Sequence, residues 1–177
     1  MALISASTIL TSLSLFHLTL GYFFYTDPQA IADQALVWVL GEATGIPPTQ
    51  TFSHPTPTTS FLSIILLLLG LSDLMTLSMP QEIWLIHYWG PQAPARSIVF
   101  GLLTIFVYFT SSSYPTTSSR SSTSKYVSGG NDGLRNNVFF TFALLEFLSW
   151  LWAWVTLREE ATAFTTRKRR RSRELLS

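Results

Sequence analysis

Hydrophobic positions along the chain gather into four long segments, separated by shorter polar stretches. A helix needs about 20 mostly apolar residues to cross the hydrocarbon core of a bilayer. Four segments have this length: 6–25, 60–79, 95–112 and 137–157. The third is the weakest, because its continuous apolar part, "SIVFGLLTIFVYFT", needs flanking residues to reach across. The pattern predicts an all-α membrane protein with four transmembrane helices in one domain over residues 1–160.

The connection after the first segment predicts one further helix. Asp27 and Pro28 form an N-cap followed by a favoured first helical residue. We expect an amphipathic helix over 28–44, which lies at the membrane interface or packs on the bundle. In one continuous helix, four apolar residues share a face: Ile31, Ala35, Trp38 and Val39.

Two other connections and the C-terminal end have a different character. Trp84, Tyr88 and Trp89 precede the third segment and predict an aromatic belt at the membrane surface. Residues 113–133 form a Ser- and Thr-rich low-complexity loop that cannot build a core. Residues 161–177 are predicted to form a basic cytosolic tail.

Composition supports a membrane protein. The chain of 177 residues is 47% hydrophobic, with a mean hydropathy of +0.32. Only 12% of its residues are charged, about half the 25% usual in soluble proteins. It has no cysteine, which excludes disulfides, thiol catalysis and zinc sites built from cysteine.

Positive charge is distributed unevenly and predicts the orientation. Residues 1–95 contain no Lys or Arg. With four spans, Arg96, Arg158 and the six bases of 167–173 lie on the side of the termini, and three bases lie opposite. The side with eight bases is expected to face the cytosol rather than the side with three, so both termini are predicted to be cytosolic. If the third segment does not cross, the N-terminus lies on the other side. The first segment lacks the positive start and cleavage site of a signal peptide and is expected to be retained.

Three ionisable residues lie inside the predicted spans: His17, Asp73 and Glu146. A charge at mid-bilayer costs about 2.5–3.5 kcal/mol, so such residues usually face the bundle interior. Each lies on a stripe of small and polar residues with helical spacing, which allows close helix approach. The stripes are Ser7, Thr11, Ser14, His17 and Gly21; Ser63, Gly70, Asp73 and Thr76; and Ala143, Glu146, Ser149, Ala153 and Thr156.

Depth in the membrane predicts which of these residues meet. His17 and Glu146 both fall near the middle of their spans and are expected to be in contact. Asp73 lies about 5 Å from the centre of its span, toward the cytosol. Its expected partner is Arg96 or Tyr88. We interpret the three residues as a buried polar seam that holds helices together. A transport or proton path and a site for a lipid head group or partner helix are the alternatives.

Catalytic chemistry has little support in the sequence. There is no serine elbow and no phosphate-binding glycine loop, and one histidine with two carboxylates lacks metal-ligand spacing. We therefore predict no enzymatic activity, no catalytic residues, no metal and no cofactor. An enzyme acting on lipid would have to use Asp73, Glu82 and His87 near one membrane surface.

The basic tail is expected to contact anionic lipid. Each base near the bilayer surface contributes about 1 kcal/mol of attraction. A retention signal or a nuclear-localisation-like patch is a weaker interpretation, and no nucleic-acid partner is predicted. The residues concerned are Arg167, Lys168, Arg169, Arg170, Arg171 and Arg173.

Three long or unusual strings lie in the first 110 residues: "SLFHLTLGYFFYTDPQAIADQALVWVLGEA", "LGLSDL" and "HYWGPQAPAR". They resemble the fungal "increased loss of mitochondrial DNA" protein family. The resemblance implies a small multi-pass protein of the endoplasmic reticulum membrane whose loss disturbs maintenance of the mitochondrial genome. It carries over no catalytic activity and no catalytic residues.

Together, these features favour a non-enzymatic accessory or scaffold protein of the endoplasmic reticulum membrane. It would support lipid or membrane homeostasis and, indirectly, mitochondrial DNA maintenance. A membrane-protein partner of unknown identity is expected. The rival hypothesis is a small transporter or channel that uses His17, Asp73 and Glu146.

Overall fold

A computed structural model describes residues 4–46, 48, 52, 54–112 and 136–174. These residues form seven helical elements: α1 (Ala6–Thr26), α2 (Pro28–Ala32), α3 (Ala35–Thr44), α4 (Pro57–Thr76), η1 (Ile83–Tyr88), α5 (Trp89–Ser112) and α6 (Asn137–Glu174). Four helices are long and apolar enough to cross a membrane. The prediction of an all-α, multi-pass membrane protein is therefore confirmed. The expected low-complexity loop at 113–133 falls wholly outside the described residues.

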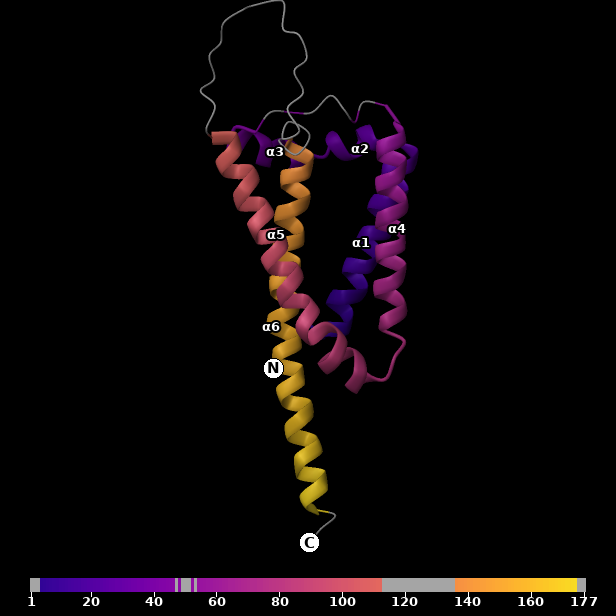
Figure 1. Cartoon of the computed structure of the whole chain (residues 1–177), viewed down its shortest axis with the longest axis vertical. Coiled ribbons are helices and arrows are strands. Elements are labelled where there is room, and N and C mark those ends of the chain that lie inside the picture. The colour runs from indigo at the N-terminus through magenta and orange to yellow at the C-terminus, as the bar shows by residue number, and fades with distance from the viewer. Residues whose placement is uncertain (1–3, 47, 49–51, 53, 113–135, 175–177) are drawn as a thin grey trace, which may run out of the picture.

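The long helices form two pairs. Helix α1 packs along α4, and α5 packs along α6, while α1 and α6 make the smaller contact between the pairs. Helices α2 and α3 lie across one end of the bundle (Figure 1). The start of α1 and the C-terminal end of α6 lie toward the other end (Figure 1). This arrangement places the two ends of the described chain on the same side.

Small residues allow α1 and α4 to approach closely. The Ser63 Oγ of α4 donates a hydrogen bond to the Gly21 carbonyl of α1 at 2.6 Å. A Cβ added at Gly70 would lie 2.8 Å from the Ser14 backbone oxygen, which is too close for an ordinary contact. In a membrane, helices associate through such packing, because lipid supplies no hydrophobic force between them. The α1–α4 pair therefore depends on glycine at this crossing.

The expected single helix over 28–44 is two helices. Asp27 caps α2 as predicted, with its Oδ1 accepting from the Ala30 N–H at 3.3 Å. Helix α2 ends at Ala32, and α3 begins at Ala35. The break changes the direction of the chain, so residues on the two sides of it no longer share a face.

The predicted apolar face of this segment is accordingly wrong. Val37 and Gly41 are buried in α3, whereas Trp38 and Val39 are 66% and 51% exposed. Gly41 faces α6, where an added Cβ would lie 3.0 Å from the Asn137 Cβ. Close packing on α6, which the hydrophobic pattern does not encode, sets the orientation of α3.

The predicted aromatic belt is also wrong for its two tryptophans. Trp84 and Trp89 are 6% and 0% exposed and belong to a core cluster with Trp150 and Leu157. Six residues before α5 form the π-helical turn η1, which continues directly into α5. Trp150 lies within the predicted span of α6 and offers Trp89 an apolar surface on which to stack.

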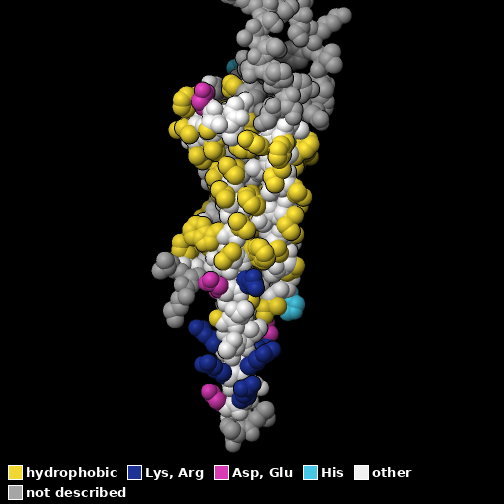
Figure 2. Space-filling model, turned by 90° about the vertical axis from the view of Figure 1, so that its left-hand side faces the viewer, with side chains coloured by type: hydrophobic (Ala, Val, Ile, Leu, Met, Phe, Trp, Pro, Cys, Tyr) yellow, Lys and Arg dark blue, Asp and Glu magenta, His cyan; other side chains and the backbone are white. Residues whose placement is uncertain are grey.

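Helix α6 is longer than the predicted span of 137–157. It runs unbroken over 38 residues, about 57 Å at 1.5 Å per residue. The residues expected as a separate tail from 161 are helical as far as Glu174. Hydrophobic side chains cover the bundle, and Lys and Arg side chains gather on the projecting part of α6 (Figure 2).

The glycine contact between α1 and α4 generates the first prediction. Gly70→Ala should lower the stability in detergent by about 1–3 kcal/mol, because the new methyl group overpacks against a backbone oxygen. Gly90→Ala is the matched control, since its Cβ would meet its nearest neighbour at an ordinary 3.5 Å. Thermal unfolding followed by size-exclusion chromatography measures both. Equal melting temperatures for the two variants would contradict the close contact.

Candidate functional site: a buried polar seam across four helices

The structure places all three intramembrane ionisable residues inside the bundle. His17 is 0%, Glu146 1% and Asp73 2% exposed. Each lies on the inward face of its helix: His17 on α1, Asp73 on α4 and Glu146 on α6. Three groups that prefer water are therefore fully removed from it, and each requires a protein partner.

His17 and Glu146 meet between α1 and α6. The His17 Nε2 lies 2.9 Å from the Glu146 Oε1, within hydrogen-bond distance. The contact joins the two helix pairs at the depth where the sequence predicted it. An ionised carboxylate only accepts hydrogen bonds. Beside an ionised Glu146, the His17 imidazole therefore donates its Nε2–H.

The second oxygen of Glu146 also has a partner. The Trp150 Nε1–H donates to Glu146 Oε2 at 2.8 Å, one helical turn along α6. Trp150 is itself 1% exposed. Both carboxyl oxygens are thus hydrogen-bonded, which is the condition under which a buried carboxyl group is tolerated.

Asp73 pairs with Arg96, one of its two expected partners. The Arg96 Nη1 lies 2.7 Å from Asp73 Oδ2, and the Nη2 lies 3.1 Å from Oδ1. This two-pronged geometry suits a planar guanidinium and a carboxylate, and it links α4 to α5. Tyr88, the other expected partner, packs edge-on against Trp89 with ring centroids 5.0 Å apart.

Two tryptophans connect the ion pair to the His17–Glu146 contact. The Trp89 and Trp150 rings stack with centroids 5.3 Å apart and planes 21° from parallel. The Arg96 Cζ lies 5.2 Å from the Trp89 ring and 4.7 Å from the Trp150 ring. A guanidinium over an aromatic face is attracted by the ring quadrupole, more strongly where water is excluded.

These contacts form one continuous arrangement, which we call the polar seam. Its six residues are His17, Glu146, Trp150, Trp89, Arg96 and Asp73. The seam runs from α1 through α6 and α5 to α4, so that all four long helices contribute to it. Among the described buried side chains, two ring nitrogens of the seam have no partner: His17 Nδ1 and Trp89 Nε1. The seam can hold the helices in register and contains no arrangement that we recognise as a nucleophile with its base.

Of the residues that an enzyme would need beside Asp73, Glu82 has a different partner. Glu82 forms an exposed ion pair with Lys168 of α6 instead. The hydrogen bond and the charge of Lys168 lower the pKa of the Glu82 carboxyl. Over the described ranges, no three His, Asp or Glu side chains lie close enough together to hold a metal ion.

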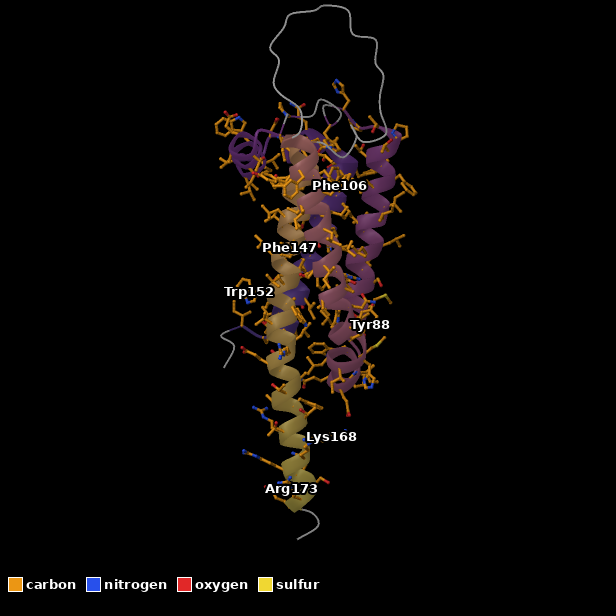
Figure 3. The ribbon with its side chains drawn as sticks, turned by 60° about the vertical axis from the view of Figure 1, so that its left-hand side comes forward. Tyr88, Phe106, Phe147, Trp152, Lys168 and Arg173 are labelled. Atoms are coloured by element: carbon orange, nitrogen blue, oxygen red, sulfur yellow. The ribbon has the colours of Figure 1, made fainter. Side chains whose placement is uncertain are left out.

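The basic residues of the tail lie on a helix. Arg167 to Arg173 belong to the last turns of α6, and the described residues there are exposed. Lys168 and Arg173 extend from the part of α6 beyond the bundle (Figure 3). Closer to the bundle, Glu160 Oε1 accepts from the Ala6 N–H at 2.7 Å. A carboxylate there stabilises the start of α1, where backbone N–H groups are otherwise unpaired.

Sequence reasoning missed the two tryptophans of the seam. Trp150 lies four residues after Glu146, a spacing at which side chains on a helix are neighbours. That spacing was a usable signal. Trp89 and Arg96 are seven residues apart, two helical turns, and the same reasoning applies to them.

Comparison with known proteins identifies a protein family. The family described as "Increased loss of mitochondrial DNA protein 1" matches residues 4–167. No curated protein and no solved structure matches the chain.

The double hydrogen bonding of Glu146 generates the second prediction. Glu146→Leu should lower stability by about 1–3 kcal/mol for each buried donor left unpaired. Glu146→Gln should have a mild effect, since its carbonyl still accepts a hydrogen bond. Glu159→Leu, at an exposed position of the same helix, is the control. Thermal unfolding in detergent is the measurement, and equal losses for Glu146→Leu and Glu159→Leu would show that the contact contributes nothing.

The Asp73–Arg96 pair generates the third prediction. Asp73→Leu alone should lower the free energy of unfolding by up to about 3–5 kcal/mol, because it leaves a largely buried cation without its partner. The 21% exposure of the Arg96 side chain reduces this loss. The double variant with Arg96→Met should be less destabilised than the sum of the two single variants. A double-mutant cycle on unfolding free energies measures the coupling. Additive effects would mean that the two groups do not interact.

Proposed function

The chain belongs to the Increased loss of mitochondrial DNA protein 1 family, and from this membership and the geometry of the seam we propose a scaffold role. In this proposal, the protein is a non-enzymatic scaffold of the endoplasmic reticulum membrane. It supports lipid and membrane homeostasis, on which retention of mitochondrial DNA depends. The link to mitochondrial DNA is then indirect.

One observation carries the scaffold proposal: every carboxyl and guanidinium group of the seam is already paired within the protein. Both oxygens of Glu146 are hydrogen-bonded, and Asp73 and Arg96 satisfy each other. A transported ion or proton needs groups that it can approach and leave. Groups paired with one another instead favour a fixed arrangement of helices, which suits a platform for other proteins.

The transporter hypothesis keeps one specific point in its favour. His17 Nδ1 is buried and has no hydrogen-bond partner within the described part of the chain. Histidine changes charge near neutral pH, which makes it the usual side chain for passing protons. A proton path through His17 and Glu146 is therefore the second candidate function.

The orientation proposed is with both ends of the chain in the cytosol. The side holding the start of α1 also holds the basic extension of α6 (Figure 1), and bases favour the cytosolic side. Anionic lipid is the proposed partner of the bases nearest the bilayer. Arg173 lies 16 residues beyond Leu157, about 24 Å along a helix. Since screening at physiological salt acts over about 8 Å, the distal bases are better placed for a protein partner.

The fourth prediction tests the scaffold role directly. Purification in mild detergent should recover a partner membrane protein in stoichiometric amounts. Replacing Arg169, Arg170 and Arg171 with Gln should release that partner, whereas replacing the same three with Lys should retain it. Mass spectrometry of the eluates measures both. A clean monomer that carries proton or ion flux in liposomes, lost in Glu146→Gln, would instead establish the transporter.

A further inference from the structure

An apolar crevice lies between the two helix pairs, next to the His17–Glu146 contact. It has a volume of about 310 Å³ and is lined chiefly by α1 and α6, with α2 and α3 closing one end. Volumes of about 300–1,000 Å³ are typical of small-molecule sites. Its walls are mostly aromatic and aliphatic side chains, including Phe16, Leu20, Phe24, Val138, Phe142 and Leu145.

Along α1 the crevice is shorter than the hydrocarbon thickness of one leaflet, roughly 15 Å. On α1 it extends from Phe16 to Phe24, about 12 Å at 1.5 Å per residue. Phe16 and Leu145 also line a second crevice, which runs on between α1 and α6 toward the termini. These two side chains therefore mark the floor of the first crevice, near the centre of the bundle.

One residue that lines the crevice, Thr141, has a buried hydroxyl without a partner. Thr141 is 3% exposed, and its Oγ1 has no hydrogen bond. Other helical threonines donate to the carbonyl four residues earlier, including Thr19, Thr104 and Thr156. Thr141 does not, although it lies within a helix. Rotation about its Cα–Cβ bond exchanges methyl and hydroxyl, so the hydroxyl can reach a molecule in the crevice.

A membrane can supply either a partner transmembrane helix or a lipid chain to this crevice. The end that α2 and α3 close decides between them. A partner transmembrane helix needs about 30 Å of groove, open at both ends. Here α2 and α3 lie across the end of α1 and α6 (Figure 1), and Ile31, Gln34 and Val37 line the crevice from above. An acyl chain of one leaflet fits this geometry, because it ends near mid-bilayer and needs only the length of the crevice.

We propose that this crevice binds one acyl chain of a membrane glycerophospholipid. The chain lies between α1 and α6 with its end toward Phe16 and Leu145. The ester group lies near Thr141, about 6 Å below the start of α6 at 1.5 Å per residue, and accepts a hydrogen bond from its hydroxyl. The head group lies at the level of Gln34. This goes beyond the scaffold role and does not depend on it.

The test uses the full-length protein in phosphatidylcholine vesicles that contain a small fraction of phosphatidylcholine with a photoreactive group in one acyl chain. After irradiation, mass spectrometry maps the labelled peptides. Labelling of 16–24 and 138–145 should exceed that of the lipid-facing side of α4 at least fivefold. If the labelling per exposed side chain is the same on the crevice segments as on α4, the proposal is overturned.

Two variants with one control make the test specific. Ala30 lines the crevice, and Ala30→Phe should reduce crevice labelling at least threefold by filling the space. Leu68→Phe, at a side chain 64% exposed on α4, adds an aromatic ring outside the crevice and should change nothing there. Thr141→Val keeps the shape and should reduce labelling about twofold or more. Unchanged labelling in Ala30→Phe, verified as monodisperse, contradicts the site.

Parallel vesicles with a photoreactive sterol or a photoreactive free fatty acid identify the lipid class. Labelling of the crevice by the phospholipid but not by the sterol supports the proposal. Labelling by the sterol alone overturns it, and so does labelling by the free fatty acid alone. Because these readouts need no partner protein, loss of the scaffold role leaves the outcome unaffected.

Discussion

The cost of placing charge in hydrocarbon is the constraint on which the rest of this structure depends. Asp73, Glu146 and Arg96 all lie where water is excluded or scarce, and each has a partner from another helix or another turn. A buried ion pair adds little net stability, but breaking one is expensive. The polar seam therefore favours one arrangement of the bundle, in which α1, α4, α5 and α6 meet in the register that pairs its carboxyl and guanidinium groups.

The rest of the bundle follows from this central connection. Close packing through glycine and serine holds α1 against α4, and the π-helical turn leads into α5, where Trp89 and Arg96 join the seam. The two helix pairs meet directly at the His17–Glu146 contact. Beyond it, toward α2 and α3, the pairs leave the apolar crevice between them. A tight polar contact at one level and an apolar gap at the next are consequences of joining two pairs at few points.

The functional proposals divide the molecule into parts with different tasks. In these proposals, the seam fixes the helices, the crevice would hold a lipid chain, and the basic extension of α6 would reach a protein in the cytosol. The ion pair between Glu82 and Lys168 and the hydrogen bond from Ala6 to Glu160 tie the extension to the bundle. A rigid extension of this kind transmits the orientation of the bundle to whatever binds its end. Membership of a family named for mitochondrial DNA loss is compatible with such an indirect role.

The sequence by itself determined the four spans and the inward faces of their helices, because hydrophobic length and the 3.6-residue period are local properties. It also determined the pairing of His17 with Glu146, since depth along each span can be counted from its ends. Only the tertiary structure decided what depends on contacts between helices. Trp89 joined the seam because Trp150 of α6 offers it a ring on which to stack. The orientation of α3 depends on the close contact of Gly41 with Asn137 of α6. Neither surface exists until α6 is in place, and so no local pattern could reveal them.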